Sequence, residues 1–171
     1  MDSRAVAELL RERFPAAVRS VEEFRGETTV TIDRTALRGV MRFLKEDPAA
    51  RYDLLVDMAG VDCGDGAPRL MVVYLLNSLS HTNRLRVKTG VAEGAEVDTV
   101  SDLWQGAEWL EREVYDMFGV RFAGHPDLRR ILLTEEFVGH PLRKEFPLAG
   151  HEFDKPVDLC AEEETGYTRD V

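Results

Sequence analysis

Residues 70–91, LMVVYLLNSLSHTNRLRVKTGV, contain the pattern that decides the fold. The first part, Leu70 to Leu76, is a continuous apolar run of the length of one strand, which is typical of the middle of a sheet. Polar turn residues follow from Ser78 to Asn83. Beyond them, apolar or β-branched residues alternate with others, at Leu85, Val87, Thr89 and Val91. The stretch therefore predicts two neighbouring strands joined by a turn.

The sequence on the N-terminal side of this pair supplies further strands and helices. Strand patterns occupy Val18 to Phe24, Thr28 to Ile32 and Tyr52 to Met58. Apolar residues at helical spacing occur from Val6 to Phe14 and again from Leu37 to Leu44. The expected fold class is therefore α+β, with a mixed or mainly antiparallel sheet flanked by helices.

Composition narrows the possible functions. A chain of 171 residues and 19.3 kDa suits one compact domain, with room for an extension. Its formal charge of -10 and pI near 4.9 argue against nucleic acid as a partner, because binding phosphates requires clustered Lys and Arg. The two cysteines, Cys63 and Cys160, form no CxxC pair that would build a zinc or iron–sulfur site from this chain's own thiolates.

The N-terminal sequence and the apolar runs bear on membranes. The first residues, MDSRAVAELLRERF, have the pattern of an amphipathic helix without the apolar core of a signal peptide. The longest apolar run, Leu70 to Leu76, is too short to span a bilayer. We expect a soluble chain that contacts a membrane only through other proteins.

A turn-rich stretch with three carboxylates raises the alternative of a calcium or magnesium site. These residues lie between Asp57 and Asp65, and Asp62 and Cys63 lie among them. The stretch lacks the regular ligand alternation and the closing Glu of an EF-hand loop. A solvated turn is the simpler interpretation.

The tripeptide Gly-His-Pro occurs twice, and it raises the alternative of a zinc or iron site. His125 and His140 lie in the two copies, and His151 could be a third ligand. The spacings do not match HExxH, and proline after a histidine favours extended backbone over a shared helical turn. The spacing therefore speaks against a metal site.

The sequence GAEWLEREVYDMF at 106–118 predicts a helix that Gly119 ends. Glu108 and Arg112 are spaced to form an ion pair on its surface. Its apolar stripe consists of Ala107, Leu110, Val114, Met117 and Phe118. Glu111, Glu113 and Asp116 lie outside this stripe and are expected on a solvated acidic face; the alternative is a carboxylate pair for acid–base chemistry.

The charge pattern changes after residue 120 and divides the chain. Residues 124–151 carry four cations and four acids, whereas residues 152–171 carry seven acids and two cations. Periodic apolar spacing fades over both stretches. We therefore expect an α+β domain at 1–120, an extended docking segment at 121–151 and an acidic tail at 152–171.

Residues 111–147 resemble the signature of a known family. The matching residues are ERE at 111–113, YDMFG at 115–119, HPDLRRIL at 125–132, GHPLRK at 139–144 and FP at 146–147. In this order they are similar to the 30-kilodalton subunit of respiratory complex I, the bacterial form of which is NADH-quinone oxidoreductase. The signature residues named for the helix are Glu111, Arg112, Glu113, Asp116, Phe118 and Gly119.

The resemblance implies a scaffold subunit in the peripheral arm of a proton-pumping complex, on the cytoplasmic side of the bacterial inner membrane. In this family the chain carries no cofactor, and partner subunits bind NADH, FMN, the iron–sulfur clusters and quinone. It braces the 49-kilodalton subunit, which helps form the quinone site, and touches cluster-bearing neighbours. The implied interface residues are His125, Asp127, Arg129, Arg130, His140, Arg143, Lys144 and Phe146.

Other functions remain open on sequence alone. Relatives occur in membrane-bound hydrogenases and in dehydrogenases with other electron donors. A stand-alone metal-dependent hydrolase would use Glu113 and Asp116 with His125 and His140. A third hypothesis is an acidic interaction module unrelated to respiration.

Overall fold

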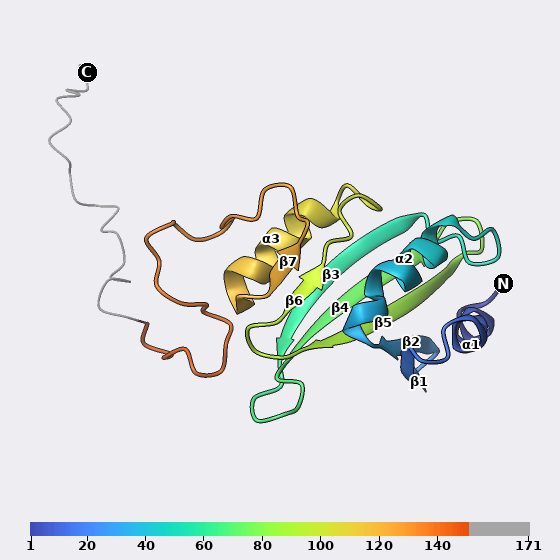
Figure 1. Ribbon diagram of the computed structural model, residues 1–171, viewed down its shortest axis with the longest axis horizontal. Coiled ribbons are helices and arrows are strands. Elements are labelled where there is room, and N and C mark those ends of the chain that lie inside the picture. The colour runs from blue at the N-terminus through green and yellow to red at the C-terminus, as the bar shows by residue number, and fades with distance from the viewer. Residues whose placement is uncertain (151–171) are drawn as a thin grey trace, which may run out of the picture.

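The computed structural model describes residues 1–150, and it contains a five-stranded sheet in the order β1-β2-β5-β4-β3 (Figure 1). The strands β2 and β5 are parallel, and all other neighbours are antiparallel. Their bounds are β1 Val18–Phe24, β2 Glu27–Ile32, β3 Leu54–Asp62, β4 Leu70–Ser78 and β5 Asn83–Val91. The predicted α+β class and the pairing of β4 with β5 are confirmed.

The register of the sheet gathers the core on one face. Val30 lies opposite Val87, Val87 opposite Tyr74, and Tyr74 opposite Met58, and all four are buried. Because successive side chains in a strand point to opposite faces, the residues beside this row point away from the core. The sheet therefore has an inner face that is covered and an outer face.

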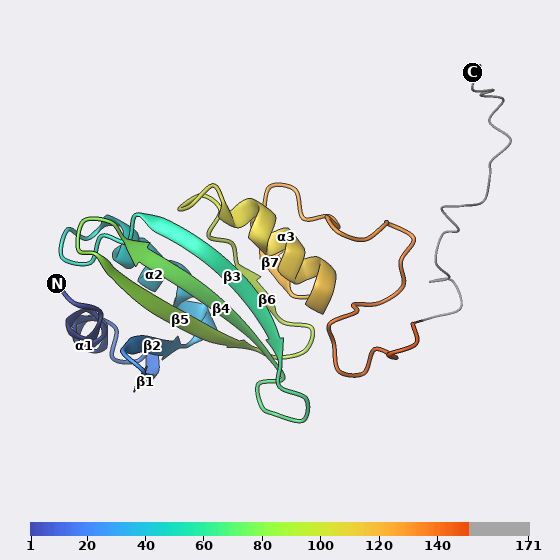
Figure 2. The ribbon, with the colours of Figure 1, turned by 180° about the vertical axis from the view of Figure 1, so that it is seen from behind.

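Helices cover the inner face. Helix α1 (Ser3–Arg13) begins at Asp2, whose side chain accepts a hydrogen bond from the N–H of Ala5, and α2 (Leu37–Glu46) follows a short 3-10 turn, η1 (Arg34–Ala36). Figure 2 shows β4 and β5 in front of α2, with no helix of the described chain over the outer face. The two faces of the sheet therefore have different surroundings.

The third helix, α3 (Ala107–Phe118), packs against β3 at Gly60. A Cβ atom placed on Gly60 would collide with the ring of Phe118, so glycine is what lets this helix approach the strand. Two short parallel strands, β6 (Glu96–Asp98) and β7 (Arg121–Ala123), flank α3 in the sequence and pair with each other. Regular structure thus continues to Ala123.

From residue 124 to residue 150 the chain forms turns and bends without a helix or strand. Figure 1 shows this stretch as a loop that returns past the C-terminal end of α3. Within residues 1–150, no helix has both the length and the apolar character that crossing a bilayer requires. The long loop is therefore held by individual polar contacts, which define the candidate site.

Candidate subunit interface

The carboxylate of Asp116 holds the loop against α3. It is fully buried, and its Oδ1 accepts a 2.6 Å hydrogen bond from Nη1 of Arg130. Its Oδ2 accepts hydrogen bonds from three consecutive backbone N–H groups, those of Ile131 (3.1 Å), Leu132 (2.9 Å) and Leu133 (2.9 Å). One side chain of the helix therefore fixes four consecutive residues of the loop.

These contacts keep Asp116 ionised. Burial raises the pKa of a carboxyl group, but the backbone N–H donors and Arg130 together favour the carboxylate more strongly, so the pKa of Asp116 lies below its usual 3.8. Arg130 also donates to the carbonyl oxygens of Phe137 (2.9 Å) and Gly139 (3.1 Å). This arginine is therefore an internal crosslink of the loop.

The second Gly-His-Pro copy closes the C-terminal end of α3. His140 bonds through Nδ1 to the carbonyl oxygen of Asp116 (2.9 Å), and Arg143 donates through Nε to the carbonyl oxygen of Phe118 (2.7 Å). The N–H of Leu142 donates to the carbonyl oxygen of Met117 (3.2 Å). The last carbonyls of a helix lack partners within it, and the loop supplies them here.

A second buried carboxylate, Asp62 at the end of β3, holds the loop farther along. Its Oδ2 accepts a 2.8 Å hydrogen bond from the N–H of Lys144, and its Oδ1 accepts one of 2.8 Å from the N–H of Gly64. These two backbone hydrogen bonds lower the pKa of Asp62, and Arg69 contributes further. The carboxylate that the sequence suggested for a cation thus binds backbone N–H groups.

Glu111 and His125 form a buried contact on the other side of α3. The carboxylate of Glu111 accepts hydrogen bonds from the N–H of Val100 (2.7 Å) and from the hydroxyl of Thr99 (2.5 Å). Burial nevertheless raises the pKa of Glu111 to about 7. Nε2 of His125 lies 3.9 Å from this carboxylate, and neither side chain is exposed.

The hydrogen bonds of His125 assign it the neutral form. Its Nδ1 accepts from the N–H of Asp127 (3.0 Å), so Nε2 carries the proton and donates to the carbonyl oxygen of Glu108 (3.0 Å). Both ring nitrogens are therefore occupied by backbone groups. Within residues 1–150 there is no group of three or more His, Cys, Asp or Glu that could hold a metal ion.

The expected solvated acidic face of α3 is wrong for two of its three carboxylates. Glu111 and Asp116 are fully buried, whereas Glu113 is exposed. The turn before α3 and the loop after it cover the two buried groups and supply their donors. The predicted surface pair also differs, because Arg112 donates to the carbonyl oxygens of residues 129 (3.1 Å) and 130 (2.8 Å) rather than to Glu108.

The loop presents apolar side chains outward. Leu128 and Leu133 pack against the core, but other large apolar residues of this region are exposed: Trp109, Leu132, Val138, Leu142 and Leu148. We call these five residues the loop patch. Exposed apolar residues gathered on one region of a surface are typical of a site that another protein covers. Phe146 is only partly exposed and stacks on Phe137, with ring centroids 5.7 Å apart.

Comparison with known proteins identifies the family. The family model described as "Respiratory-chain NADH dehydrogenase, 30 Kd subunit" matches residues 30–152. The chain belongs to this family. A NADH-quinone oxidoreductase subunit from Geobacter metallireducens is 55% identical over 150 residues, which are 86% of this chain and 91% of that protein. The corresponding subunit from Geobacter sulfurreducens is 52% identical over 151 residues, or 87% and 91% of the two chains.

Solved structures agree with the 30-kilodalton-subunit family. A trypsin-resistant fragment of Nqo5 superposes with a TM-score of 0.63 at 35% identity, covering 73% of this chain and 99% of that one. A chain of the membrane-bound sulfane sulfur reductase, an archaeal respiratory membrane complex, gives a TM-score of 0.69 at 26% identity, covering 85% of each chain. The predicted family is thereby confirmed, and with it a subunit of the respiratory NADH dehydrogenase rather than of a complex with another donor.

The predicted interface residues fall into two groups. Four are engaged with their own chain, namely His125, Arg130, His140 and Arg143. Asp127 and Arg129 form an exposed ion pair of 2.8 Å, and the side chain of Lys144 is exposed. Sequence patterns did not predict the loop patch, for which the available signal was leucine and valine without helical or strand spacing. His151 lies outside the described residues.

Proposed function

We propose that this chain is a non-catalytic scaffold of NADH-quinone oxidoreductase and docks through residues 124–150 onto the quinone-site subunit of the 49-kilodalton type. The observation that carries the proposal is the latch at Asp116, which holds an irregular loop in one shape with apolar side chains facing outward. A loop that is already ordered loses little conformational entropy when it binds. Its exposed leucines can then supply apolar contact area to the partner.

The chemistry of the polar residues supports a scaffold role. The carboxylates of Asp116 and Glu111 accept hydrogen bonds from the chain's own backbone, and the imidazole of His125 is fully enclosed. A hydrolase would need such groups to face a substrate. We therefore propose that partner subunits hold the flavin, the clusters and the quinone, and that this chain positions them.

The proposed setting is the cytoplasmic face of the bacterial inner membrane, with the membrane reached only through the complex. Cluster-bearing subunits are the further neighbours that the family suggests. The formal charge of -10 is consistent with partners that are proteins rather than nucleic acids.

Co-purification tests the proposal. A tagged chain replaces the native copy in its source strain, and the complex is isolated from solubilised membranes. We expect flavin- and cluster-containing subunits to co-purify with the tagged chain. In the double variant Leu132→Asp/Leu142→Asp this retention should fall at least tenfold, because carboxylates would be buried against apolar partner atoms. Loss of NADH oxidation by the membranes should follow the loss of retention.

Leu79→Asp is the matched control, because Leu79 is an equally exposed leucine in the turn between β4 and β5. It should leave assembly unchanged. Arg129→Glu tests a predicted interface cation cleanly, since Arg129 contacts only Asp127 through its side chain. Arg143→Glu would also break the contact with Phe118. A wild-type chain that retains no redox subunit would refute the proposed function.

A further inference from the structure

The outer face of the sheet carries an apolar surface that no described residue covers. In an antiparallel sheet with one solvated face, strands alternate between apolar inward and polar outward residues. Strands β3 and β4 depart from this rule, because much of their outward side is apolar as well. The residues concerned are Leu54, Val56, Val61, Met71, Val73 and Leu75. We call them the outer-face patch.

The register places these side chains next to one another. Val61 lies opposite Met71, and Leu75 lies opposite Asp57. Val56 is the additional residue at the bulge between Leu55 and Asp57, and its side chain is 53% exposed. The patch therefore extends across two strands rather than consisting of isolated leucines and valines.

Strand β5 adds a row of cations beside the patch. Arg84, Arg86 and Lys88 alternate along the strand, and they lie opposite Asn77, Leu75 and Val73 of β4. Arg86 forms an ion pair with Glu27, but Arg84 and Lys88 have no carboxylate partner within residues 1–150. In a chain with 32 acidic and 22 basic residues, two unpaired cations on one apolar face indicate that the carboxylates come from elsewhere.

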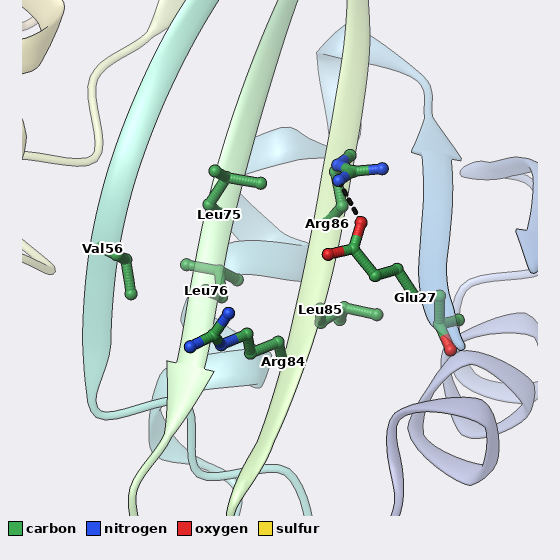
Figure 3. Close-up of a pocket in the computed structure, with 8 residues that line it drawn as sticks. Glu27, Val56, Leu75, Leu76, Arg84, Leu85 and Arg86 are labelled. Atoms are coloured by element: carbon green, nitrogen blue, oxygen red, sulfur yellow. Dashed lines mark hydrogen bonds and ion pairs between the residues drawn. The ribbon is translucent and has the colours of Figure 1, made fainter. Parts of the chain in front are cut away.

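A hollow lies between the apolar and the basic rows. Its volume is about 160 Å³, which accommodates a side chain. Figure 3 shows Val56 and Leu75 beside it, with Arg84 extending over β4. The same view shows Glu27 reaching Arg86, so that one of the three cations on β5 is already neutralised.

We propose that the outer face docks an acidic, amphipathic segment of another subunit of the same complex. One apolar side chain of that segment enters the hollow beside Val56 and Leu75, and its carboxylates pair with Arg84 and Lys88. The proposal rests on the proposed function, because the complex supplies the segment. A second copy of this chain fits less well, because self-association would bring two more unpaired cations to the interface.

A zero-length carbodiimide crosslink, which joins an amine to a carboxylate in direct contact, tests the pairing in the purified complex. We expect a crosslink from Lys88 to an Asp or Glu of another subunit. Lys88→Arg keeps the charge but removes the amine, so the crosslink should disappear while assembly is unchanged. A crosslink from Lys88 to a second copy of this chain, or within the chain, would overturn the proposal, as would the absence of any crosslink.

Charge reversal provides the second measurement. In Arg84→Glu/Lys88→Glu, retention of the complex should fall about tenfold or more, and Val56→Asp should weaken it in the same direction. Arg42→Glu is the control, because Arg42 is exposed, has no ion pair in the described chain and lies on α2, behind the sheet. The thermal unfolding midpoint of each isolated variant should equal that of the wild type.

The outcomes separate the two proposals. A wild-type chain that co-purifies with the complex, together with outer-face variants that match Arg42→Glu, would refute the docking on the sheet and leave the scaffold role intact. A wild-type chain that retains no partner would overturn both.

Discussion

Replacement of Glu111 by glutamine should make the protein more stable above pH 7. Glu111 is fully buried and contacts Thr99 and the backbone of Val100. A glutamine has the same shape, and its carbonyl oxygen can accept from the N–H of Val100. Its amide can donate to the hydroxyl of Thr99, which can turn its own proton toward Ser101, 2.8 Å away. The substitution therefore removes the charge and keeps the hydrogen bonds.

The magnitude follows from the pKa of Glu111, which burial raises from 4.5 to about 7. Below pH 4.5 the group is protonated in both the folded and the unfolded state. As the pH rises, the unfolded state loses the proton first, so the free energy of unfolding falls until the folded state also ionises near pH 7. At about 1.4 kcal/mol per pKa unit, wild type should lose about 2 to 3 kcal/mol between pH 5 and pH 8 through this group. The Glu111→Gln variant should not show this loss.

Urea unfolding from pH 5 to pH 8.5 measures the effect, with the fluorescence of the buried Trp104 as a probe beside Glu111's turn. Glu113→Gln is the matched control, since it is the same substitution at an exposed position of the same helix. The difference between Glu111→Gln and wild type should grow with pH, and the control should follow wild type. Parallel curves for all three proteins would show that Glu111 ionises normally and would refute the reasoning.

Three further substitutions test the packing around the loop. Asp116→Asn should lower the free energy of unfolding by about 3 kcal/mol and speed tryptic cleavage after Arg130, because it leaves that guanidinium facing an amide in place of a carboxylate; unchanged cleavage would contradict the latch. Gly119→Ala should cost about 1 to 3 kcal/mol in urea unfolding, since φ is +74° there and the new Cβ would lie 2.6 Å from Nε2 of His140; a neutral result would show that the loop can move away. Gly60→Val should cost a similar amount by displacing the ring of Phe118 from β3, and thermal unfolding would detect it.

Local patterns were sufficient to predict most of the sheet and helices. The alternation at Leu85 to Val91 identified β5, and helical spacing identified α1 and α2, because these elements bury one face each. The strand predicted at Tyr52 to Met58 is Leu54–Asp62 in the structure. Its last residues include Gly60, which weakens a strand pattern, and only the packing of α3 explains that glycine. The short strands β6 and β7 were missed, since three residues form no pattern.

The candidate site was harder to predict, because its polar residues are satisfied by backbone groups distant in sequence. Helical spacing placed Glu111 and Asp116 correctly outside the apolar stripe, and a solvated face follows if nothing else covers the helix. The loop and the preceding turn do cover it, and a donor such as the N–H of Leu132 leaves no signature in composition. The family signature located the region, but only the three-dimensional contacts separate the internally bonded residues from the exposed ones.

The three buried carboxylates act in opposite directions with pH, and together they fix where the docking loop is best held. The pKa values of Asp116 and Asp62 are lowered, so their contribution to stability is present above about 3.8 and is lost as the pH falls through the folded-state pKa. The pKa of Glu111 is raised, so its contribution is complete below 4.5 and is lost as the pH rises through about 7. Both groups of contacts are therefore favourable in the same narrow range near pH 4 to 5. At neutral pH the loop is held by the two aspartates while Glu111 opposes folding, which makes the aspartate latches the contacts on which the proposed interface depends.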